Sequence, residues 1–261
     1  MFLPRSGVDY GTIDADVEYF STTAGDNKRC NVLLPAGYDP AQAYPVLYVI
    51  HGFGRAYDDL VYDGGYLPTL YGNLLADGLA APQIIVGVDM YTDKLADKSD
   101  KTNEELRFIY DKVVDDIAID LMPFIEQNYS AETGRSSAAV AGVSQGASEA
   151  LCTGFKWLDK FGYIGSFSSD PGVIPTEFFK GSFWNVPYFQ QFPTPTASNE
   201  PFYLYLSVGT EDPWNVGCTR YYGEVLDEAG IRNQTDIIPG FAHEDAFWEQ
   251  CFYNLLTKAF K

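Results

Sequence analysis

AAVAGVSQGA, residues 138–147, contains the pattern G-x-S-x-G at 142–146. In this pattern a serine lies on a sharp turn between a buried strand and a helix, and the two glycines let these elements approach closely. The apolar residues 138–141 fit the strand, and the alanine-bearing residues after 146 fit the helix. Because Gly and Ser are common, the pattern alone could be an ordinary turn. Its context favours Ser144 as an exposed nucleophile.

Short apolar segments alternate with helical segments along the rest of the chain. The nearly all-apolar run PVLYVI, residues 45–50, is typical of a strand covered on both faces of a sheet. The alternation indicates βαβ units and a mainly parallel sheet. Together with the turn at Ser144, it predicts the α/β-hydrolase fold, with helices on both faces of the sheet. Strands are expected at 29–34, 45–50, 83–88, 138–142, 163–167, 203–208 and 235–238, and helices at 105–128, 147–158, 219–229 and 246–260.

The chain length of 261 residues suits one catalytic domain, residues 1–261. Residues 171–201 interrupt the alternation and are rich in proline and aromatic side chains. A long insertion between two strands of such a domain is usually a functional loop or lid. We therefore expect an insertion at about 171–201 within a single domain.

Composition narrows the range of ligands. The net charge of −19 disfavours binding to nucleic acid, whose phosphates an acidic surface repels. No apolar run approaches the ~20 residues that cross a bilayer, and no cluster of metal ligands is visible, so we expect neither membrane binding nor a metal. Aromatic residues make up 16% of the chain, and those not in the core would suit a carbohydrate or aromatic ligand.

The order nucleophile, acid, histidine is typical of the fold. The chain has two histidines, and His51 precedes Ser144, so His243 on the loop after the last strand is the predicted general base. Asp212 follows the strand 203–208 and is the predicted orienting acid. Two carboxylates remain as alternatives for the acid: Asp170 and Glu211.

Backbone amides are expected to stabilise the oxyanion, one from the residue after the nucleophile and one from the loop after the strand 45–50. These are Gln145 and Phe53, with Gly54 as the alternative donor and substrate-binding position. Trp184 in the insertion and Trp214 after Asp212 lie on loops that should converge on the same crevice. We predict that both tryptophans line the substrate pocket; the alternative is that they pack their loops onto the domain.

These motifs resemble the esterase-D-like group of α/β hydrolases, which includes feruloyl esterases, acetylxylan esterases, S-formylglutathione hydrolases, enterochelin esterases and mycolyltransferases. The resemblance covers nearly the whole chain. Among the members, the chain is most similar to feruloyl esterases of plant-cell-wall degraders. The motifs that carry it are YPVLYVIHG (44–52), LMPFIEQNY (121–129), the turn at Ser144, LDKF (158–161) and GTED (209–212).

The resemblance implies a serine esterase that hydrolyses feruloyl and p-coumaroyl esters on arabinoxylan without a cofactor. Two positions depart from the usual Gly-x-Ser-Met-Gly-Gly of the family: Gln145 stands for Met and Ala147 for the last Gly. An acetylxylan esterase, another carboxylesterase, an acyltransferase and a non-catalytic carbohydrate-binding relative are the alternatives.

The location of the protein is expected to be extracellular, with a cytoplasmic location as the alternative. The first residues, MFLPR, lack the features of a signal peptide, so an extracellular chain would begin here at a mature boundary. Four cysteines permit two disulfides. Cys218 and Cys251 lie in the helices after the acid and histidine loops, and we expect a bridge between them.

Overall fold

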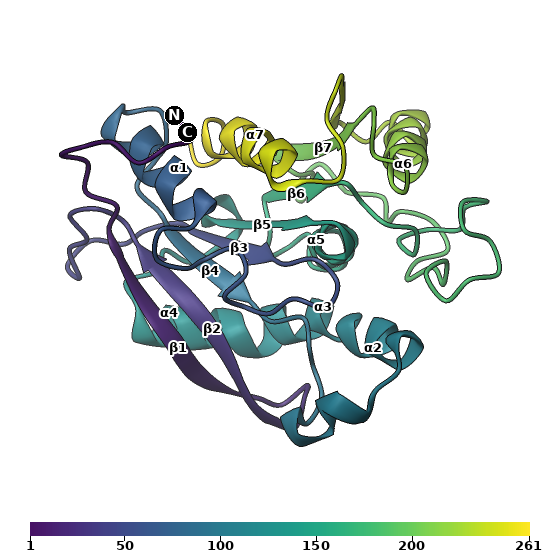
Figure 1. The fold of residues 1–261 in the computed structure, drawn as a ribbon, viewed down its shortest axis with the longest axis horizontal. Helices are drawn as coiled ribbons and strands as arrows, with labels where there is room; N and C mark the ends of the chain where they lie inside the picture. The colour runs from purple at the N-terminus through teal and green to yellow at the C-terminus, as the bar shows by residue number, and fades with distance from the viewer.

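The computed structural model describes residues 1–261 as one eight-stranded sheet with helices on both faces (Figure 1). Strands β3 to β8 pair with their neighbours in parallel, whereas β1 pairs with β2 and β2 with β4 in antiparallel fashion. The predicted architecture, a mainly parallel sheet between helices, is confirmed. Across the sheet the order is β1 (Thr12–Ser21), β2 (Asp26–Leu34), β4 (Ile84–Val88), β3 (Val46–Ile50), β5 (Ala138–Val143), β6 (Tyr163–Phe167), β7 (Tyr203–Gly209) and β8 (Gln234–Ile238).

All seven predicted strands are present, and the three central ones, β3, β4 and β5, are buried along their whole length. Their runs of Val, Ile, Leu and Ala suit a strand that packs against helices on both sides. Strand β1 is not among the predicted strands, and most of its side chains are exposed or half-buried. Because the parallel strands end at one edge of the sheet, the loops after β5, β6, β7 and β8 come together there.

Two helical layers cover the sheet. Helices α1 and α7 lie side by side on one face, and α2 to α6 cover the other (Figure 1). The chain termini meet near α1 and α7. The helices are α1 (Tyr66–Ala76), α2 (Asn103–Tyr110), α3 (Val113–Asp116), α4 (Met122–Asn128), α5 (Gln145–Lys156), α6 (Val216–Glu228) and α7 (Asp245–Leu256), with short turns η1 (Leu95–Asp100), η2 (Ile117–Leu121) and η3 (Arg135–Ser137).

The prediction of one continuous helix over 105–128 is wrong. It is divided into α2, α3, a π-helical turn (η2) and α4. Pro123, the second residue of α4, has no N–H to donate, and its ring clashes with the carbonyl four residues earlier. The π turn directly before α4 widens the helix at that point, which is a common adjustment.

The segment between β6 and β7 contains no helix or strand and projects to the right of Figure 1. Backbone hydrogen bonds from Tyr188 to Gly172 and from Phe189 to Val173 hold its two arms together. The buried ring of Phe192 packs against Phe155 of α5, with ring centroids 4.8 Å apart. The insertion is thus anchored on the helix that follows Ser144.

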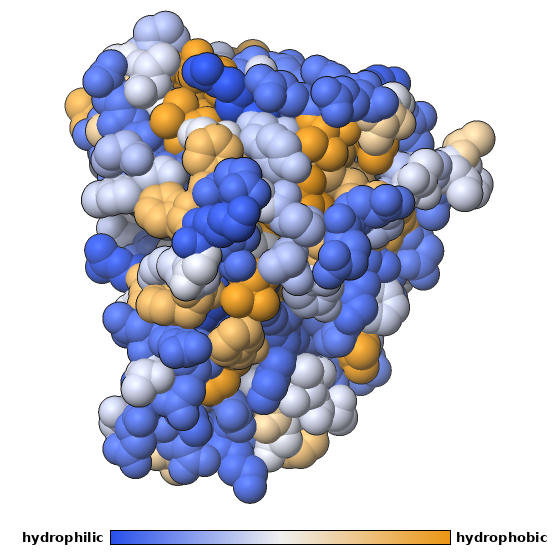
Figure 2. Space-filling view, turned by 90° about the vertical axis from the view of Figure 1, so that its right-hand side faces the viewer, coloured by the Kyte–Doolittle hydropathy of each residue, from blue (hydrophilic) through white to orange (hydrophobic).

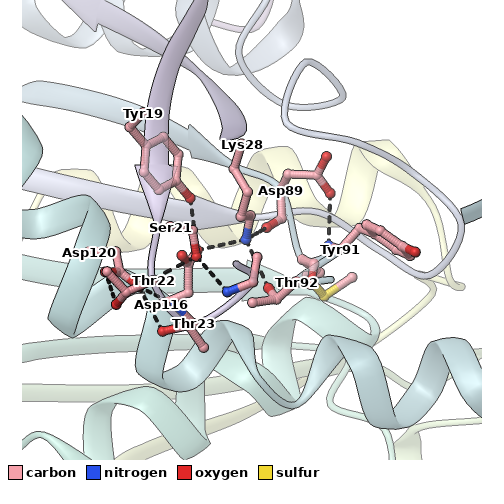
Figure 3. Close-up of polar contacts among 12 residues, drawn as sticks. Tyr19, Ser21, Thr22, Thr23, Lys28, Asp89, Tyr91, Thr92, Asp116 and Asp120 are labelled. Carbon is pink, nitrogen blue, oxygen red and sulfur yellow. Dashed lines mark hydrogen bonds and ion pairs between the residues drawn. The ribbon is translucent and has the colours of Figure 1, made fainter. Parts of the chain in front are cut away.

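A buried ion pair joins the antiparallel hairpin to the helices (Figure 3). The Lys28 ammonium on β2 lies 2.6 Å from the Asp116 carboxylate of α3, and both side chains are almost fully buried. Lys28 also donates to the Asp89 carbonyl (2.9 Å) and to the Thr92 hydroxyl (2.8 Å), so its three protons are all used. The Tyr19 hydroxyl donates to the same Asp116 oxygen. The Lys28 ammonium is thus fully hydrogen-bonded, whereas the second Asp116 oxygen is buried without a partner.

The expected disulfide between Cys218 and Cys251 is wrong, because all four cysteines are free and buried. Cys218 of α6 packs in the core on one face of the sheet, and Cys251 of α7 packs in the core on the other. The sheet lies between the two sulfur atoms. Burial raises the pKa of the Cys218 thiol to about 12, so it is held as an unreactive thiol.

None of the helices combines the length and the apolar character that crossing a lipid bilayer requires. On the side of the molecule seen in Figure 2, hydrophobic residues form separate groups between hydrophilic ones.

Candidate active site

Ser144 lies on the turn between β5 and α5 with φ 55° and ψ −126°, a strained conformation for a residue with a side chain. The neighbouring glycines allow it. A Cβ atom on Gly142 would lie 2.1 Å from the Gly146 oxygen, and one on Gly146 would lie 2.4 Å from the Ile50 oxygen. Neither position accepts a side chain. The turn leaves Ser144 half-exposed at the carboxyl edge of the sheet.

The structure brings Ser144, His243 and Asp212 together. The His243 Nε2 atom lies 3.0 Å from the Ser144 hydroxyl, and Nδ1 lies 2.8 Å from an Asp212 oxygen. These contacts fit an imidazole that carries its proton on Nδ1 and accepts from the serine. The other Asp212 oxygen accepts from the amides of Trp214 (3.1 Å) and Asn215 (3.0 Å). Burial works to raise the pKa of Asp212, but the bonds from His243 and Asn215 outweigh it and hold this pKa below its usual value.

The two alternative acids do not contact the imidazole. Asp170 accepts a hydrogen bond of 2.6 Å from the Asn215 side chain, and Glu211 is exposed with the Thr210 hydroxyl beside it. His51 is buried below the site. Its ring lies between the Gly52 carbonyl (2.7 Å from Nδ1) and the Met90 amide (3.1 Å from Nε2), and it shapes the loop after β3.

Two indole rings flank the imidazole of His243. The ring of Trp214, which is 56% exposed, lies edge-on to the imidazole with ring centroids 5.4 Å apart. The ring of Trp248 also lies edge-on, with centroids 5.2 Å apart. Both rings pack against the imidazole. Trp214 is a predicted site residue, whereas Trp248 is not. The sequence could have indicated Trp248 as a site residue, because it lies in the first turn of α7, directly after the loop that carries His243.

The loop after β3 brings Phe53 beside Ser144. The Phe53 amide donates to no group of the chain, as expected of a donor reserved for a ligand. Gln145 is the first residue of α5, where N–H groups have no acceptor within the helix. The Phe53 ring packs against Trp184, with centroids 4.8 Å apart. Gly54 is exposed at φ 74° and lines neither of the cavities beside Ser144.

Two cavities meet at Ser144. The smaller, about 370 Å³, is walled mainly by Phe and Trp rings, and its polar residues besides Ser144 and His243 are Asp170 and Asn215. The larger, about 920 Å³, extends past Trp248 and is lined by charged and aromatic residues. Phe53, Ser144 and His243 line both. The aromatic walls of the smaller cavity, which we call the aromatic cavity, are Phe53, Phe179, Trp184 and Trp214.

A buried charged cluster lies behind the turn and was not predicted. The side-chain amide of Gln145 donates to the Glu149 carboxylate, one helical turn later. Arg107 of α2 pairs with both Glu149 and Asp111. Burial, reinforced by the nearby Asp111 carboxylate, raises the pKa of Glu149 well above its usual value. The Gln145 side chain thus points into the protein, and its backbone amide remains at the site. The sequence signal was Gln145 itself, which replaces an apolar residue of the family pattern.

Comparisons with known proteins point to the esterases. The Esterase family model, described as "Putative esterase", matches residues 21–246. The chain is 28% identical over 264 residues to an endo-1,4-beta-xylanase/feruloyl esterase of Xylanibacter ruminicola. That alignment covers 98% of this chain and 32% of the relative, so the chain spans about a third of the curated protein it matches.

Solved structures show the same fold. The CE1 ferulic acid esterase of Anaeromyces mucronatus, determined in complex with ferulic acid, has a TM-score of 0.87 and 30% identity, covering 99% of this chain and 94% of that one. The S-formylglutathione hydrolase of Staphylococcus aureus shares the fold at 15% identity, with a TM-score of 0.64 and coverage of 100% of each chain. The chain therefore belongs to the Esterase family and is a carboxylic ester hydrolase of the α/β-hydrolase fold.

Proposed function

We propose that this chain hydrolyses hydroxycinnamate esters, feruloyl and p-coumaroyl, on plant cell-wall arabinoxylan through an acyl-enzyme on Ser144. His243 takes the proton of the Ser144 hydroxyl as the oxygen attacks the ester carbonyl. Asp212 fixes the imidazole tautomer and stabilises its charged form. His243 then gives the proton to the departing sugar alcohol, and water releases the acid by the same route.

The oxyanion formed in each step is assigned to the backbone amides of Phe53 and Gln145. Loss of one such donor typically costs about 3 kcal/mol of transition-state stabilisation. The proposal needs no cofactor, because the serine, the imidazole and the two amides supply all the groups of acyl transfer.

The observation that carries the proposal is the aromatic cavity beside Ser144. Its volume of about 370 Å³ and its Phe and Trp walls suit a planar aromatic acyl group. An acetyl group would leave most of this cavity unfilled, which disfavours the acetylxylan esterase alternative. The relationship to ferulic acid esterases supports the same choice.

The proposal is tested by comparing methyl ferulate and methyl p-coumarate with methyl acetate as substrates, and p-nitrophenyl acetate serves as a general esterase substrate. We expect higher kcat/KM for the two hydroxycinnamates than for methyl acetate, which has the same leaving group. A preference for acetyl over feruloyl esters with matched leaving groups would contradict the substrate assignment. Faster transfer to an added alcohol than to water would identify an acyltransferase.

The tryptophans at the aromatic cavity provide a prediction. Replacing Trp184 or Trp214 with alanine is expected to lower kcat/KM for methyl ferulate about tenfold, since ring contacts are worth about 0.5–1.5 kcal/mol beyond burial. The loss for p-nitrophenyl acetate should be smaller, because its acyl group does not reach these walls. Equal losses for both substrates, or a large fall in Tm, would show a structural role instead.

Asp170 provides a prediction on acyl selectivity. Burial in the aromatic cavity, opposed by the hydrogen bond from Asn215 and the charges of His243 and Arg107, raises the pKa of Asp170 to about 6. Above this pH the carboxylate can accept the phenolic hydroxyl of p-coumarate, which cinnamate lacks. Asp170→Asn should reduce the kcat/KM ratio of methyl p-coumarate to methyl cinnamate about tenfold, because hydrogen bonds to charged groups contribute about 1.5–3 kcal/mol.

The kcat/KM ratio of methyl p-coumarate to methyl cinnamate should also depend on pH, in a direction that the pKa of Asp170 determines. Protonation removes the charged acceptor, so the wild-type ratio should fall as the pH drops through about 6. Titration of the catalytic groups affects both substrates equally and cancels in the ratio. A ratio that is independent of pH and unchanged in Asp170→Asn would exclude Asp170 from acyl recognition.

We also propose that residues 1–261 act as a single catalytic domain carrying the insertion at about 171–201. An extracellular location is part of the same proposal, because polymeric cell-wall substrates lie outside the cell. Neither nucleic acid nor membrane is an expected partner.

A further inference from the structure

Arg107 is a buried cation that the proposed mechanism does not use. Its side chain is 2% exposed, and its helix, α2, lines neither cavity at Ser144. Its carboxylate partners are Asp111, one turn later on α2, and Glu149 of α5, whose oxygen lies 3.5 Å away. A buried ion pair is often no more stabilising than well-packed apolar residues of similar volume. Stability alone therefore does not explain a cation at this position.

The Arg107 guanidinium packs against the start of the insertion. Gly172 has φ 116°, and a Cβ atom on it would collide with an Arg107 nitrogen, so the guanidinium lies directly against this backbone. The same Cβ atom would lie 3.1 Å from the Trp184 carbonyl oxygen. The Tyr188 amide donates to the Gly172 carbonyl at 2.8 Å. Both arms of the insertion and the backbone of Trp184 thus meet at the glycine that Arg107 contacts.

Gly172 lies next to the lining of the aromatic cavity. Asp170 and Pro171, the two residues before it, line that cavity, and so does Trp184. We call these three residues the acyl wall. Neither Gly172 nor Arg107 lines the cavity, so the guanidinium does not contact an acyl group bound there. Arg107 can act on the acyl group only through the backbone against which it packs.

We propose that Arg107 is a positioning residue that holds the acyl wall in place relative to Ser144 and thereby determines the preference for an aromatic acyl group. Glu149 connects it to α5, the helix that begins directly after Ser144, and Gly172 connects it to the insertion. Arginine suits this place, because its planar group can pair with carboxylates while it packs against other groups. The inference rests on the proposed function and adds a residue that determines its acyl specificity.

The test is the acyl preference of Arg107→Met, measured as the kcat/KM ratio of methyl ferulate to methyl acetate. The two esters share their leaving group, so the ratio reports on the acyl side alone. We expect it to fall about tenfold, because a displaced wall loses its ring contacts with the feruloyl group. Ser144 should still react with a small organophosphonate at the wild-type rate, whereas general damage to the domain would slow this reaction as well.

Gly172→Ala disturbs the same contact from the other side. It keeps the charge of Arg107 but forces the insertion away from the guanidinium. The ratio should fall as in Arg107→Met, and the double variant should lose little more than either single one, because both substitutions break one contact. Gly172→Ala also tests the proposal if Arg107→Met does not fold.

Arg135 provides the matched control. Its guanidinium holds the other end of the insertion, outside both cavities, by donating to the carbonyls of Asn199 (3.0 Å) and Glu200 (2.7 Å). Arg135→Met removes the same type of side chain from the same segment. We expect it to lower Tm and to leave the ratio of methyl ferulate to methyl acetate unchanged.

The outcomes separate this inference from the proposed function. If the wild type prefers methyl ferulate but the ratio is unchanged in Gly172→Ala and in Arg107→Met, the positioning role is wrong and the feruloyl esterase assignment stands. An equal fall in Arg135→Met would also overturn the positioning role, because any disturbance of the insertion would then suffice. If the wild type does not hydrolyse methyl ferulate, the proposed function fails, and the positioning role fails with it.

Discussion

Replacement of Ser144 by alanine is expected to lower kcat/KM for methyl ferulate by about 10⁴-fold or more. The hydroxyl 3.0 Å from the His243 imidazole is the nucleophile in the proposed mechanism, and no other group replaces it. Binding should be retained, because the aromatic cavity is otherwise intact. Initial rates of ferulic acid release, followed by chromatography, and calorimetric titration with ferulate measure the two effects.

The same experiment on His243 tests the general base. His243→Ala should be nearly as severe as Ser144→Ala, since members of a triad act as a unit. More than about a tenth of wild-type turnover in this variant would show that the base is another group, because loss of a triad member usually costs several orders of magnitude. The Tm of both variants is the control for folding.

The second large effect is expected on stability, from the ion pair between β2 and α3. Lys28→Met leaves the Asp116 carboxylate buried without its cation (Figure 3). Breaking one side of such a pair typically costs about 3–5 kcal/mol, which for a chain of this size lowers Tm by about 6–20 °C. Differential scanning calorimetry at pH 7 measures the change. Activity on methyl ferulate well below Tm should be retained, because the pair lies outside both cavities.

Arg29, which follows Lys28 on β2, offers a matched control for the loss of an ion pair. Arg29 pairs with Glu18 at 2.9 Å, but their side chains are 49% and 55% exposed. Exposed pairs contribute about 0–1 kcal/mol, so Arg29→Met should shift Tm by only a few degrees. The double variant Lys28→Met and Asp116→Leu should recover much of the loss, because it removes both charges. A Tm loss no larger for Lys28→Met than for Arg29→Met would contradict the account of the buried pair.

The elements that could be predicted from the sequence are those under strong local constraint. The turn at Ser144 requires glycine at 142 and 146 for steric reasons, so the pattern carries its own geometry. The central strands are continuous apolar runs, because they are buried on both faces. His243 was identified by its place after the last strand and by the scarcity of histidine. These features are fixed by neighbours in sequence.

Other features depend on packing between distant segments. Edge strand β1 alternates charged and half-buried residues and gives no continuous apolar run. Helix α1 contains Pro68 and Gly72, which weaken its local signal; Gly72 is required where the Tyr10 ring packs against the helix. Asp170 was weighed as a catalytic acid and instead lines the aromatic cavity. Sequence order could not distinguish it from Asp212, because the choice depends on which strand end lies below the imidazole.

The central claim is a feruloyl-enzyme on Ser144, and pre-steady-state hydrolysis of 4-nitrophenyl ferulate tests it most directly. This activated ester should acylate the serine faster than water removes the acyl group, so we predict a burst of about one 4-nitrophenol per active site before the steady phase. Mass spectrometry of the acid-quenched enzyme should find the feruloyl group on the peptide that contains Ser144. Linear release from the first turnover, with no feruloyl group on that peptide, would contradict the account.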